Sequence, residues 1–433
     1  MNPCEKGPGR KDARRSMDCQ RNGGWVETKA LIAMSGGVDS AVAALLTARE
    51  GNTCLGCTLR LYDGPEAPGG QRSCCTLEDA EDARAVAYRL GMPYYVWNFT
   101  EAFRSGVMEP FADCYQRGET PNPCIECNRL LKFGKLLDRA EELGCDCLVT
   151  GHYARIIRED GRYLLKKGLD PEKDQSYVLY MLSQDQLARL RFPLGTLRKP
   201  EVRQLAEANG FLNARKPDSQ DICFVPDGDY AAAIERLTGH RAEPGNFVDR
   251  SGRVLGQHRG IIRYTVGQHR GLGLGWHEPL YVLRLDKARN EVVLGPEAAL
   301  YTRTVRVPAF HWIAGAPPAG AKRCTAKLRY RQREQSALAE PLPDGGVLLR
   351  FDAPQRAPAP GQSAVLYDAD TVLGGGIIAA EAQGGTEAEG ATAGGLPPGE
   401  PLAGGGAAAG GFPPGGPLAG GLPPGNHRQT ARR

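Results

Sequence analysis

Apolar residues follow two different periods in the first half of the chain. Short apolar runs read as strands, and between them apolar residues recur at helical spacing. Strands that alternate with helices predict a doubly wound α/β fold, in which helices cover both faces of a parallel sheet. In such sheets ligands bind at the carboxyl ends of the strands. The predicted strands are residues 29–34, 53–61, 93–99 and 145–150, and the predicted helices are residues 40–49, 76–90, 101–116 and 130–143.

From about residue 245 the pattern changes to short strand-like runs separated by Gly and Pro turns. This texture predicts small β-rich domains, the last of them a β-barrel. The predicted strands here are residues 281–285, 291–294, 326–330, 346–351 and 363–367. After residue 382 the chain becomes rich in Gly, Pro and Ala without the strict glycine period of collagen, which predicts disorder.

Five segments therefore follow from the pattern. We expect a disordered basic extension, a catalytic α/β domain, a central small β-rich domain, a C-terminal β-barrel domain and a disordered tail. Their expected bounds are residues 1–25, 26–230, 231–300, 301–382 and 383–433.

Composition supports a soluble globular protein, with 41% hydrophobic and 24% charged residues among 433. No apolar run is long enough for a membrane helix, and the first 25 residues lack the apolar core of a secretory signal. We expect a cytoplasmic bacterial protein. A mitochondrial presequence is the alternative, although Pro3, Gly7, Pro8 and Gly9 interrupt any amphipathic helix there. The formal charge of +4 is small, so any RNA-binding surface must concentrate basic residues locally.

Thirteen cysteines without an export signal argue against a disulfide scaffold. Most are expected to be small buried side chains, as Cys145 and Cys147 would be on one face of a strand. The adjacent pair Cys74 and Cys75 is expected to be structural or incidental, because neighbouring side chains point apart in a strand.

A candidate phosphate loop, Ser35–Ser40, lies between the first predicted strand and the first predicted helix. Paired glycines allow a sharp turn, and the helix start offers free N–H groups and a positive dipole end to an anion. The lysine of a Walker loop is absent. A loop without this lysine could retain pyrophosphate as a unit, and Asp39 could hold Mg²⁺ for it. The alternative is an ordinary glycine-rich turn capped by serine.

The string Ser-Gly-Gly-Val-Asp-Ser resembles the loop of the ATP-pyrophosphatase superfamily, whose members adenylate a substrate oxygen and release pyrophosphate. By this resemblance the chain uses ATP, and Asp39 is the candidate ligand for Mg²⁺. The residues that the resemblance assigns to ATP binding are Ala33, Met34, Ser35, Gly36, Gly37, Val38, Asp39, Ser40, Leu59 and Gly151.

Three cysteines stand in segments that suggest chemistry. Cys124 and Cys127 lie in the proline-stiffened loop 120–128, and Cys223 lies in the segment 218–224. Prolines preset the backbone, so the two loop thiols are held in place. Cys127 is expected at a helix start, where the dipole favours the thiolate.

Several ordered motifs together resemble the family of tRNA-specific 2-thiouridylases, over residues 28–380. The resemblance implies that ATP adenylates the C2 oxygen of a wobble uridine and that cysteine sulfur then replaces the oxygen. It assigns the nucleophile to Cys127 and the persulfide to Cys223, which can end as a disulfide. It implies tRNAs of the Glu, Gln and Lys type and a sulfur donor, either a cysteine desulfurase or relay protein or inorganic sulfide. The matching segments are residues 35–40, 120–128, 150–153, 173–177, 218–224, 267–273, 329–332, 361–365 and 373–377.

The chain departs from the usual family pattern at Cys124, where many members have an aspartate. A carboxylate acid or base is therefore unavailable at this position. Three alternatives stay open. Cys124, Cys127 and Cys223 could hold a [4Fe-4S] cluster that leaves one iron open; a persulfide could act without metal; or the thiols could bind zinc, which usually takes four ligands.

A row of basic residues is the candidate RNA surface. Lys327, Arg329, Arg331 and Arg333 alternate, so a strand would place all four on one face. The alternative is a charged edge strand that prevents aggregation. The base must leave its stack to be reached. The resemblance places the target base at Asn122, Pro123 and Cys124, and further tRNA contacts at His152, Lys173, Asp174, Gln175, Arg329, Tyr330 and Gln362.

Two of these features have plainer interpretations. A single His after a strand, such as His152, is more often structural than catalytic. The segment 271–275 looks like a nucleotide loop but lies in the β region and lacks a following helix, so we interpret it as a flexible basic turn.

Two rival functions remain. The first is another ATP-pyrophosphatase. An amidotransferase-linked synthetase would need a glutamine-hydrolysing domain, which the sequence does not indicate, and argininosuccinate synthase has no need of paired reactive cysteines. A non-catalytic RNA-binding or iron–sulfur carrier would release no pyrophosphate.

Overall fold

The computed structural model describes residues 28–62, 77–218, 222–225, 228–275 and 278–380. All of them lie in the first of two compact units, Met1–Gly385. The expected terminal extension and tail, and the pair Cys74 and Cys75, fall outside the described residues. Within those residues, no helix combines the length and apolar character needed to cross a membrane.

The first sheet is parallel throughout and has the strand order β3-β2-β1-β4-β7. Order reverses on either side of β1, which makes the carboxyl end of β1 the switch point where ligands bind in such sheets. The strands are β1 (Lys29–Ala33), β2 (Thr53–Arg60), β3 (Tyr94–Asn98), β4 (Cys147–Val149) and β7 (Leu190–Arg191).

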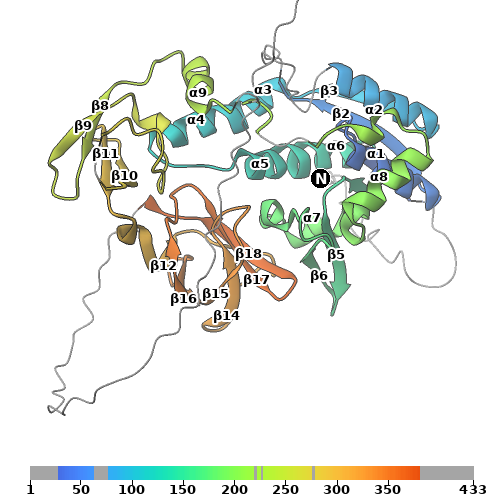
Figure 1. Ribbon diagram of the computed structural model, residues 1–433. Coiled ribbons are helices and arrows are strands. Elements are labelled where there is room, and N and C mark those ends of the chain that lie inside the picture. The colour runs from blue at the N-terminus through green and yellow to red at the C-terminus, as the bar shows by residue number, and fades with distance from the viewer. Residues whose placement is uncertain (1–27, 63–76, 219–221, 226–227, 276–277, 381–433) are drawn as a thin grey trace, which may run out of the picture. The chain divides into compact units, whose positions relative to one another are not determined.

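Helices cover both faces of this sheet, because the side chains of β1 alternate between two apolar clusters. Ala30 and Ile32 pack into the cluster that contains α1 (Val38–Arg49), α2 (Leu77–Arg89) and α8 (Lys199–Ala208). Leu31 packs into the other cluster. The expected doubly wound α/β fold is confirmed (Figure 1). The second face carries α3 (Thr100–Phe103), η1 (Arg104–Met108), α4 (Glu109–Gln116), α5 (Pro123–Glu126), η2 (Cys127–Lys135) and α6 (Leu136–Glu142).

The central domain is a mixed sheet of order β10-β11-β8-β9 beside a helix. β11 pairs in parallel with β8, and the other two pairings are antiparallel. Its elements are α9 (Tyr230–Thr238), β8 (Gly245–Val248), β9 (Val254–His258), β10 (Tyr281–Asp286) and β11 (Glu291–Gly295).

The C-terminal domain is an antiparallel sheet that extends into the first domain. A hairpin of β5 (Ala154–Glu159) and β6 (Arg162–Lys167) leaves the α/β domain and pairs with β18, Lys166 opposite Thr371. The Asp370 carboxylate bonds Arg155 at 2.7 Å and Lys166 at 3.1 Å. The remaining strands are β12 (Tyr301–Val307), β13 (His311–Trp312), β14 (Lys322–Lys327), β15 (Gln335–Pro341), β16 (Val347–Arg356), β17 (Ser363–Asp368) and β18 (Thr371–Ile377).

Short helical segments connect these parts. One is the α-helix α7, which begins with a capping box at Ser183. The others are 3₁₀ turns. The bounds of all these connecting segments are α7 (Gln184–Ala188), η3 (Ser176–Leu179), η4 (Pro193–Thr196), η5 (Leu212–Arg215), η6 (Ile261–Arg263) and η7 (Glu297–Leu300).

The strand expected at residues 326–330 is wrong. β14 ends at Lys327, and the chain turns instead. The Leu328 N–H donates to the Gln332 side chain at 3.0 Å, and the Gln332 N–H donates to the Arg329 carbonyl at 3.1 Å. These bonds close a turn that removes the flat row of Lys327, Arg329, Arg331 and Arg333.

Candidate active site

The phosphate loop turns at Gly36, which has a φ of +75°. A Cβ at this position would lie 2.3 Å from the Asp79 carbonyl oxygen, so only glycine fits. The Ser40 hydroxyl accepts the Ser35 N–H at 3.1 Å and donates to the Gly37 carbonyl at 3.0 Å. Gly37 caps α1 without a side-chain bond, which leaves the first N–H groups of the helix to an anion.

Gly151 meets this loop at the carboxyl end of β4. A Cβ on Gly151 would lie 2.9 Å from the Asp39 carbonyl carbon and 3.0 Å from the Ser40 nitrogen. Leu59, at the end of β2, is buried next to Thr58, whose hydroxyl donates to the Met34 carbonyl at 2.6 Å. The residues that the sequence assigned to ATP thus lie around the carboxyl ends of β1, β2 and β4.

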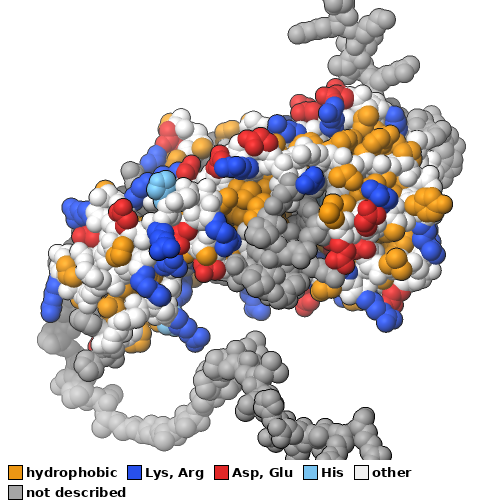
Figure 2. Space-filling view, turned by 90° about the horizontal axis from the view of Figure 1, so that it is seen from above, with side chains coloured by type: hydrophobic (Ala, Val, Ile, Leu, Met, Phe, Trp, Pro, Cys, Tyr) orange, Lys and Arg blue, Asp and Glu red, His pale blue; other side chains and the backbone are white. Residues whose placement is uncertain are grey.

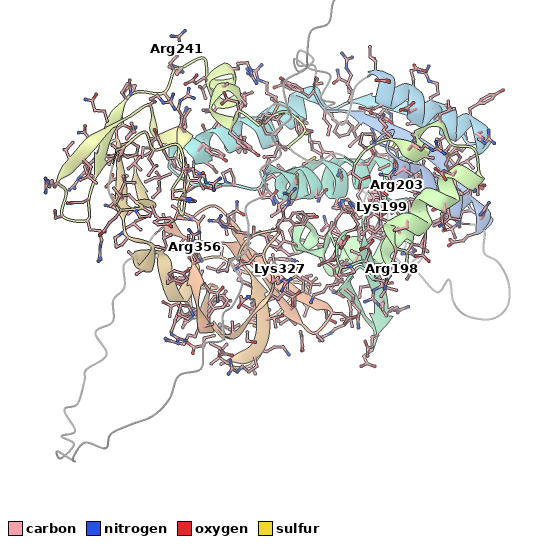
Figure 3. The ribbon with its side chains drawn as sticks, viewed as in Figure 1. Arg198, Lys199, Arg203, Arg241, Lys327 and Arg356 are labelled. Atoms are coloured by element: carbon pink, nitrogen blue, oxygen red, sulfur yellow. The ribbon has the colours of Figure 1, made fainter. Side chains whose placement is uncertain are left out.

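Asp39 is the centre of a polar network that comes from distant parts of the chain. Its carboxylate accepts the Tyr153 hydroxyl at 2.7 Å and the Lys199 ammonium at 2.7 and 2.8 Å. Burial, together with Asp39, raises the pKa of Tyr153, so its hydroxyl stays protonated as a donor. Lys199 comes from the start of α8 and is buried (Figure 3).

A second carboxylate, Asp218, gathers three cations beside Asp39. It bonds Lys199 and Lys173 at 2.8 Å each and Arg203 at 2.9 Å. Burial would raise the pKa of the Asp218 carboxyl, but Lys173 and Lys199 outweigh it and hold the pKa below its ordinary value. Asp218 is therefore ionised at neutral pH.

Sequence reasoning missed Lys199 and Arg203. Lys199 is 160 positions from Asp39. The local signal at Lys199 is only that of a helix start, with proline next in the chain. Nothing in that signal indicates which distant carboxylate the ammonium meets.

The underside of the loop is held by a third set of polar contacts. The Asn213 side-chain amide donates to the Gly36 carbonyl at 2.9 Å. Lys216 bonds Asp79 at 2.5 Å and Asp82 at 2.7 Å on α2. These contacts fix the segment that Gly36 packs against.

The cysteine-bearing helix begins earlier than expected, at Pro123. The Asn122 side chain accepts the Cys124 N–H at 3.1 Å as an N-cap, and proline occupies the first helical position. Cys124 therefore lies in the first turn, and the expectation that Cys127 stands at the helix start is wrong. Cys127 instead begins the π-helix η2, a wider turn of the kind often found at functional sites.

Cys127 and Cys223 pack against the same apolar core and are both half-buried, whereas Cys124 is exposed. Phe224 anchors the Cys223 segment, because its ring packs edge-on against Phe103 at 5.7 Å and Phe111 at 5.1 Å. Residues 219–221 of this segment lie outside the described residues.

Across the described part of the chain, no three or more His, Cys, Asp or Glu side chains are arranged to hold a metal ion. The positions of Cys124, Cys127 and Cys223 thus do not form a ready cluster or zinc site. Asp39 can still serve Mg²⁺, because this ion is usually bound by one or two carboxylates together with substrate phosphates.

Several residues expected to face tRNA are engaged within the protein. His152 is 7% exposed and bonds the Thr150 hydroxyl at 2.7 Å. The Arg329 guanidinium donates to the carbonyls of Val266 at 3.2 Å and Ala357 at 3.0 Å. These two side chains have the contacts of packing residues, while Arg331 and Arg333 are exposed.

The segment 173–175 also supports the fold. Lys173 bonds Asp218, Asp174 accepts the N–H groups of Gly168 and Ser176, and Gln175 accepts the Tyr153 N–H. Tyr330 packs against Tyr177 at 5.8 Å.

Gln362 joins the C-terminal domain to the cysteine loop. Its amide donates to the Thr120 carbonyl at 2.6 Å, and the Thr120 N–H donates to the Pro360 carbonyl at 2.8 Å. The residues expected at the target base, Asn122, Pro123 and Cys124, follow directly, so a loop of the C-terminal sheet braces the start of the cysteine helix.

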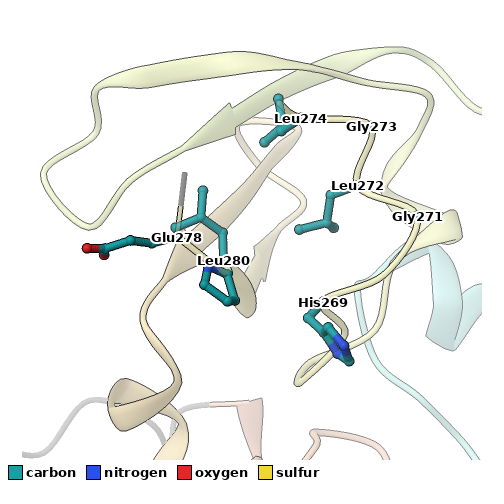
Figure 4. Close-up of a pocket in the computed structure, with 8 residues that line it drawn as sticks. His269, Gly271, Leu272, Gly273, Leu274, Glu278 and Leu280 are labelled. Atoms are coloured by element: carbon teal, nitrogen blue, oxygen red, sulfur yellow. The ribbon is translucent and has the colours of Figure 1, made fainter. Parts of the chain in front are cut away.

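An open cavity of ≈ 330 Å³ lies elsewhere, in the central domain (Figure 4). Its lining includes His269, Leu272, Leu274 and Glu278 and no residue of the phosphate loop. The glycine turn 271–275 therefore borders a hollow with both polar and apolar lining, and the described elements place no helix directly after it.

Comparison with known proteins decides the family. A tRNA-specific 2-thiouridylase MnmA of Chloroflexus aurantiacus is 49% identical over 350 residues, which cover 81% of this chain and 98% of that protein. The chain belongs to the tRNA-specific 2-thiouridylase family. A relative of the same name from Magnetococcus marinus is 48% identical over 80% of this chain and 98% of that protein.

Family models agree along the whole body. A tRNA methyl transferase HUP domain matches residues 28–227, a tRNA methyl transferase PRC-barrel domain matches residues 234–296, and an aminomethyltransferase β-barrel domain matches residues 302–378. A solved 4-thiouridine synthetase–RNA complex with bound ATP is 18% identical, with a TM-score of 0.30 over 49% of this chain and 50% of that one. A likeness of that size says nothing about chemistry.

Proposed function

We propose that the chain is a tRNA 2-thiouridylase, which converts a wobble uridine, ATP and a cysteine-borne sulfur into 2-thiouridine, AMP and pyrophosphate. The observation that carries the proposal is the glycine loop at the switch point of the sheet. Gly36 lets the loop turn tightly against α2, and Gly151 lets the end of β4 approach the start of α1. The uncapped N–H groups of that helix start suit a polyphosphate. Family membership supplies the tRNA and the sulfur.

The first step is adenylation. The uridine C2 oxygen attacks the α-phosphorus of ATP, and the bond to the β-phosphate oxygen breaks with its electron pair on pyrophosphate. The α1 N–H groups and the Ser35 hydroxyl would bind the phosphates, while Ser40 holds the loop in shape. Asp39 would supply a carboxylate to Mg²⁺, which shields phosphate charge when bound.

The second step transfers sulfur. The terminal sulfur of a Cys223 persulfide attacks C2, and the C2–oxygen bond breaks as AMP leaves. The Cys127 thiolate then attacks the Cys223 sulfur, which releases 2-thiouridine and leaves a Cys127–Cys223 disulfide. An external dithiol reduces the disulfide, and a desulfurase or relay protein then reloads the Cys223 thiolate with the outer sulfur of its own persulfide. Inorganic sulfide would instead attack the Cys223 sulfur of the disulfide, which forms the Cys223 persulfide and frees the Cys127 thiolate.

A [4Fe-4S] cluster at Cys124, Cys127 and Cys223 remains a prediction, and no step above passes through it. Anaerobic reconstitution followed by iron and sulfide analysis tests it. Four irons per chain that are lost in Cys124→Ala would support the cluster, and a colourless protein with full activity would exclude it.

The proposed tRNA surface shifts with the turn after β14. Because Arg329 is committed to two carbonyls, exposed Arg331 and Arg333 are the better phosphate contacts. Figure 2 shows basic side chains spread among acidic ones on the face it displays. The positions of individual basic residues therefore matter more for tRNA binding than the net charge of that face. Arg331→Glu should raise the tRNA dissociation constant and leave ATP binding unchanged; Arg84→Glu on α2 is the control.

The overall test is pyrophosphate release that depends on tRNA, with 2-thiouridine detected by mass spectrometry. Cys127→Ser and Cys223→Ser should abolish thiouridine, while the intact ATP site still releases pyrophosphate. Wild-type enzyme that released no pyrophosphate with any tRNA substrate would refute the proposal.

A further inference from the structure

The phosphate loop has no lysine of its own, yet a lysine reaches it from another element. Lys199 lies at the first position of α8, where its backbone N–H donates to Asp170 at 2.9 Å. Its ammonium bonds both oxygens of Asp39, the second residue of α1. The charge therefore sits beside the helix start that binds phosphate.

The contacts of Lys199 exceed those of a simple structural ion pair. Its ammonium is shared by two carboxylates from different segments, Asp39 and Asp218, and lies 5.9 Å from the centre of the Tyr153 ring. Its side chain is 9% exposed. A buried ammonium is costly unless anions surround it, and phosphate oxygens can take the place of either carboxylate.

Asp218 gives this lysine two cationic neighbours. The same carboxylate bonds Lys173, after the β5–β6 hairpin, and Arg203, one turn further along α8. Figure 3 shows Lys199 and Arg203 close together on that helix. One anion thus holds three cations from two segments at the edge of the phosphate loop.

We propose that Lys199 binds the phosphates of ATP that leave as pyrophosphate, and that Asp218 is a positioning residue that holds Lys199, Lys173 and Arg203 around them. The proposal rests on the adenylation step proposed above. As the bond between the α-phosphorus and its leaving oxygen breaks, the electron pair moves to pyrophosphate. The Lys199 ammonium stabilises that charge and keeps its own protons.

The source of the cation distinguishes this ATP site from a Walker site. A Walker loop carries its lysine within the loop, whereas here the cation belongs to α8 and its position depends on Asp218. An exposed pair would be worth little, but a buried donor aimed at developing charge typically changes a rate by roughly 10²–10³.

The test uses inorganic pyrophosphate as the probe on the full chain. Its dissociation constant is measured by calorimetry for wild type, Lys199→Gln, Lys199→Arg and Asp218→Asn. We expect Lys199→Gln to weaken pyrophosphate binding at least tenfold and Lys199→Arg to recover part of the affinity. The dissociation constant of Asp218→Asn should lie between those of the two Lys199 variants. tRNA-dependent pyrophosphate release should fall about 100-fold in Lys199→Gln.

Lys166→Gln is the matched control, because Lys166 also lies in a part-buried ion pair, with Asp370. It should bind pyrophosphate as wild type does. Unchanged binding in a folded Lys199→Gln, judged by its thermal midpoint, overturns the role of Lys199. If Lys199→Gln does not fold, Lys199→Arg and Asp218→Asn decide: wild-type affinity in both overturns the proposal. Wild-type enzyme that binds pyrophosphate but forms no thiouridine contradicts the proposed function instead.

Discussion

At the scale of single residues, His152 shows how burial sets a role. Its ring packs between Phe133 and Phe192, with ring centres 5.6 and 5.7 Å away. Burial, and to a lesser degree Lys132, lowers the pKa of His152 well below its ordinary value. The folded protein therefore keeps this imidazole neutral.

This burial predicts a pH-dependent stability. An unfolded His titrates near 6.5. Below that pH the unfolded state therefore binds a proton that the folded state does not. The contribution of His152 to stability is complete above pH 6.5 and declines below it, by at most about 1.4 kcal/mol per pH unit. Replacing His152 by Gln should therefore reduce the loss of unfolding free energy between pH 7.5 and 5.5 by roughly 1 kcal/mol.

Denaturant titrations at the two pH values measure this difference. His240→Gln is the control, because His240 is exposed. Its loss of unfolding free energy between the two pH values should match that of wild type. An equal pH dependence in wild type and His152→Gln would contradict the assignment.

Residues whose role depends on local backbone could be predicted from the sequence. Gly36 and Ser40 form the turn that the sequence predicted after β1, because a glycine turn between a strand and a helix is a local property. Lys199 and Arg329 could not be predicted. Their partners are 160 and 63 positions away, and only the packed fold decides whether a cation faces solvent, a carboxylate or a carbonyl.

At the scale of elements, the sequence located the first strands and helices closely but missed the start of the cysteine-bearing helix. Period-two and apolar runs located β1, β2 and β3 to within two residues. The sequence predicts a proline-stiffened loop over residues 120–128, with the helix start at Cys127. Proline at the first helical position breaks no hydrogen bond, so the helix begins there with Asn122 as its cap.

Two glycines of the first strand–helix unit allow a matched test. Gly36 and Gly51 have similar left-handed φ values, +75° and +81°. A Cβ on Gly51 would meet nothing within 4 Å, whereas one on Gly36 would collide with Asp79. Gly51→Ala should cost about 1–2 kcal/mol of unfolding free energy and keep activity. Gly36→Ala should cost more and should abolish ATP-dependent pyrophosphate release.

The comparison separates backbone strain from crowding, since both variants carry the first and only Gly36→Ala carries the second. Equal losses of activity in the two variants would show that the close approach to α2 is unimportant. Unfolding free energies and pyrophosphate release, measured on the same samples, give the answer.

At the scale of the whole molecule, one apolar core spans all three domains. It includes Leu31 of β1, Phe247 of the central sheet and Tyr367 of the C-terminal sheet. Lys167 adds a bridge, with its ammonium 2.6 Å from Glu334 and 4.6 Å from the centre of the Tyr367 ring. A shared core couples the stability of the domains.

We therefore expect the described domains to unfold together. Trp97 lies in β3 and Trp312 in β13, so each reports on a different domain. Variants that keep only one of the four tryptophans, with the others changed to Phe, should show the same denaturant midpoint by fluorescence. Two separate midpoints would mean that the shared core does not couple the domains.

The hairpin that crosses from the α/β domain into the last sheet limits how this chain can be recombined. A chimera that replaces residues 301–380 with those of a relative would pair β6 with the relative's β18. Arg155 and Lys166 would then lose their ion pairs with Asp370. The exchangeable module is therefore discontinuous in sequence, and a successful graft must carry residues 154–167 along with the C-terminal domain.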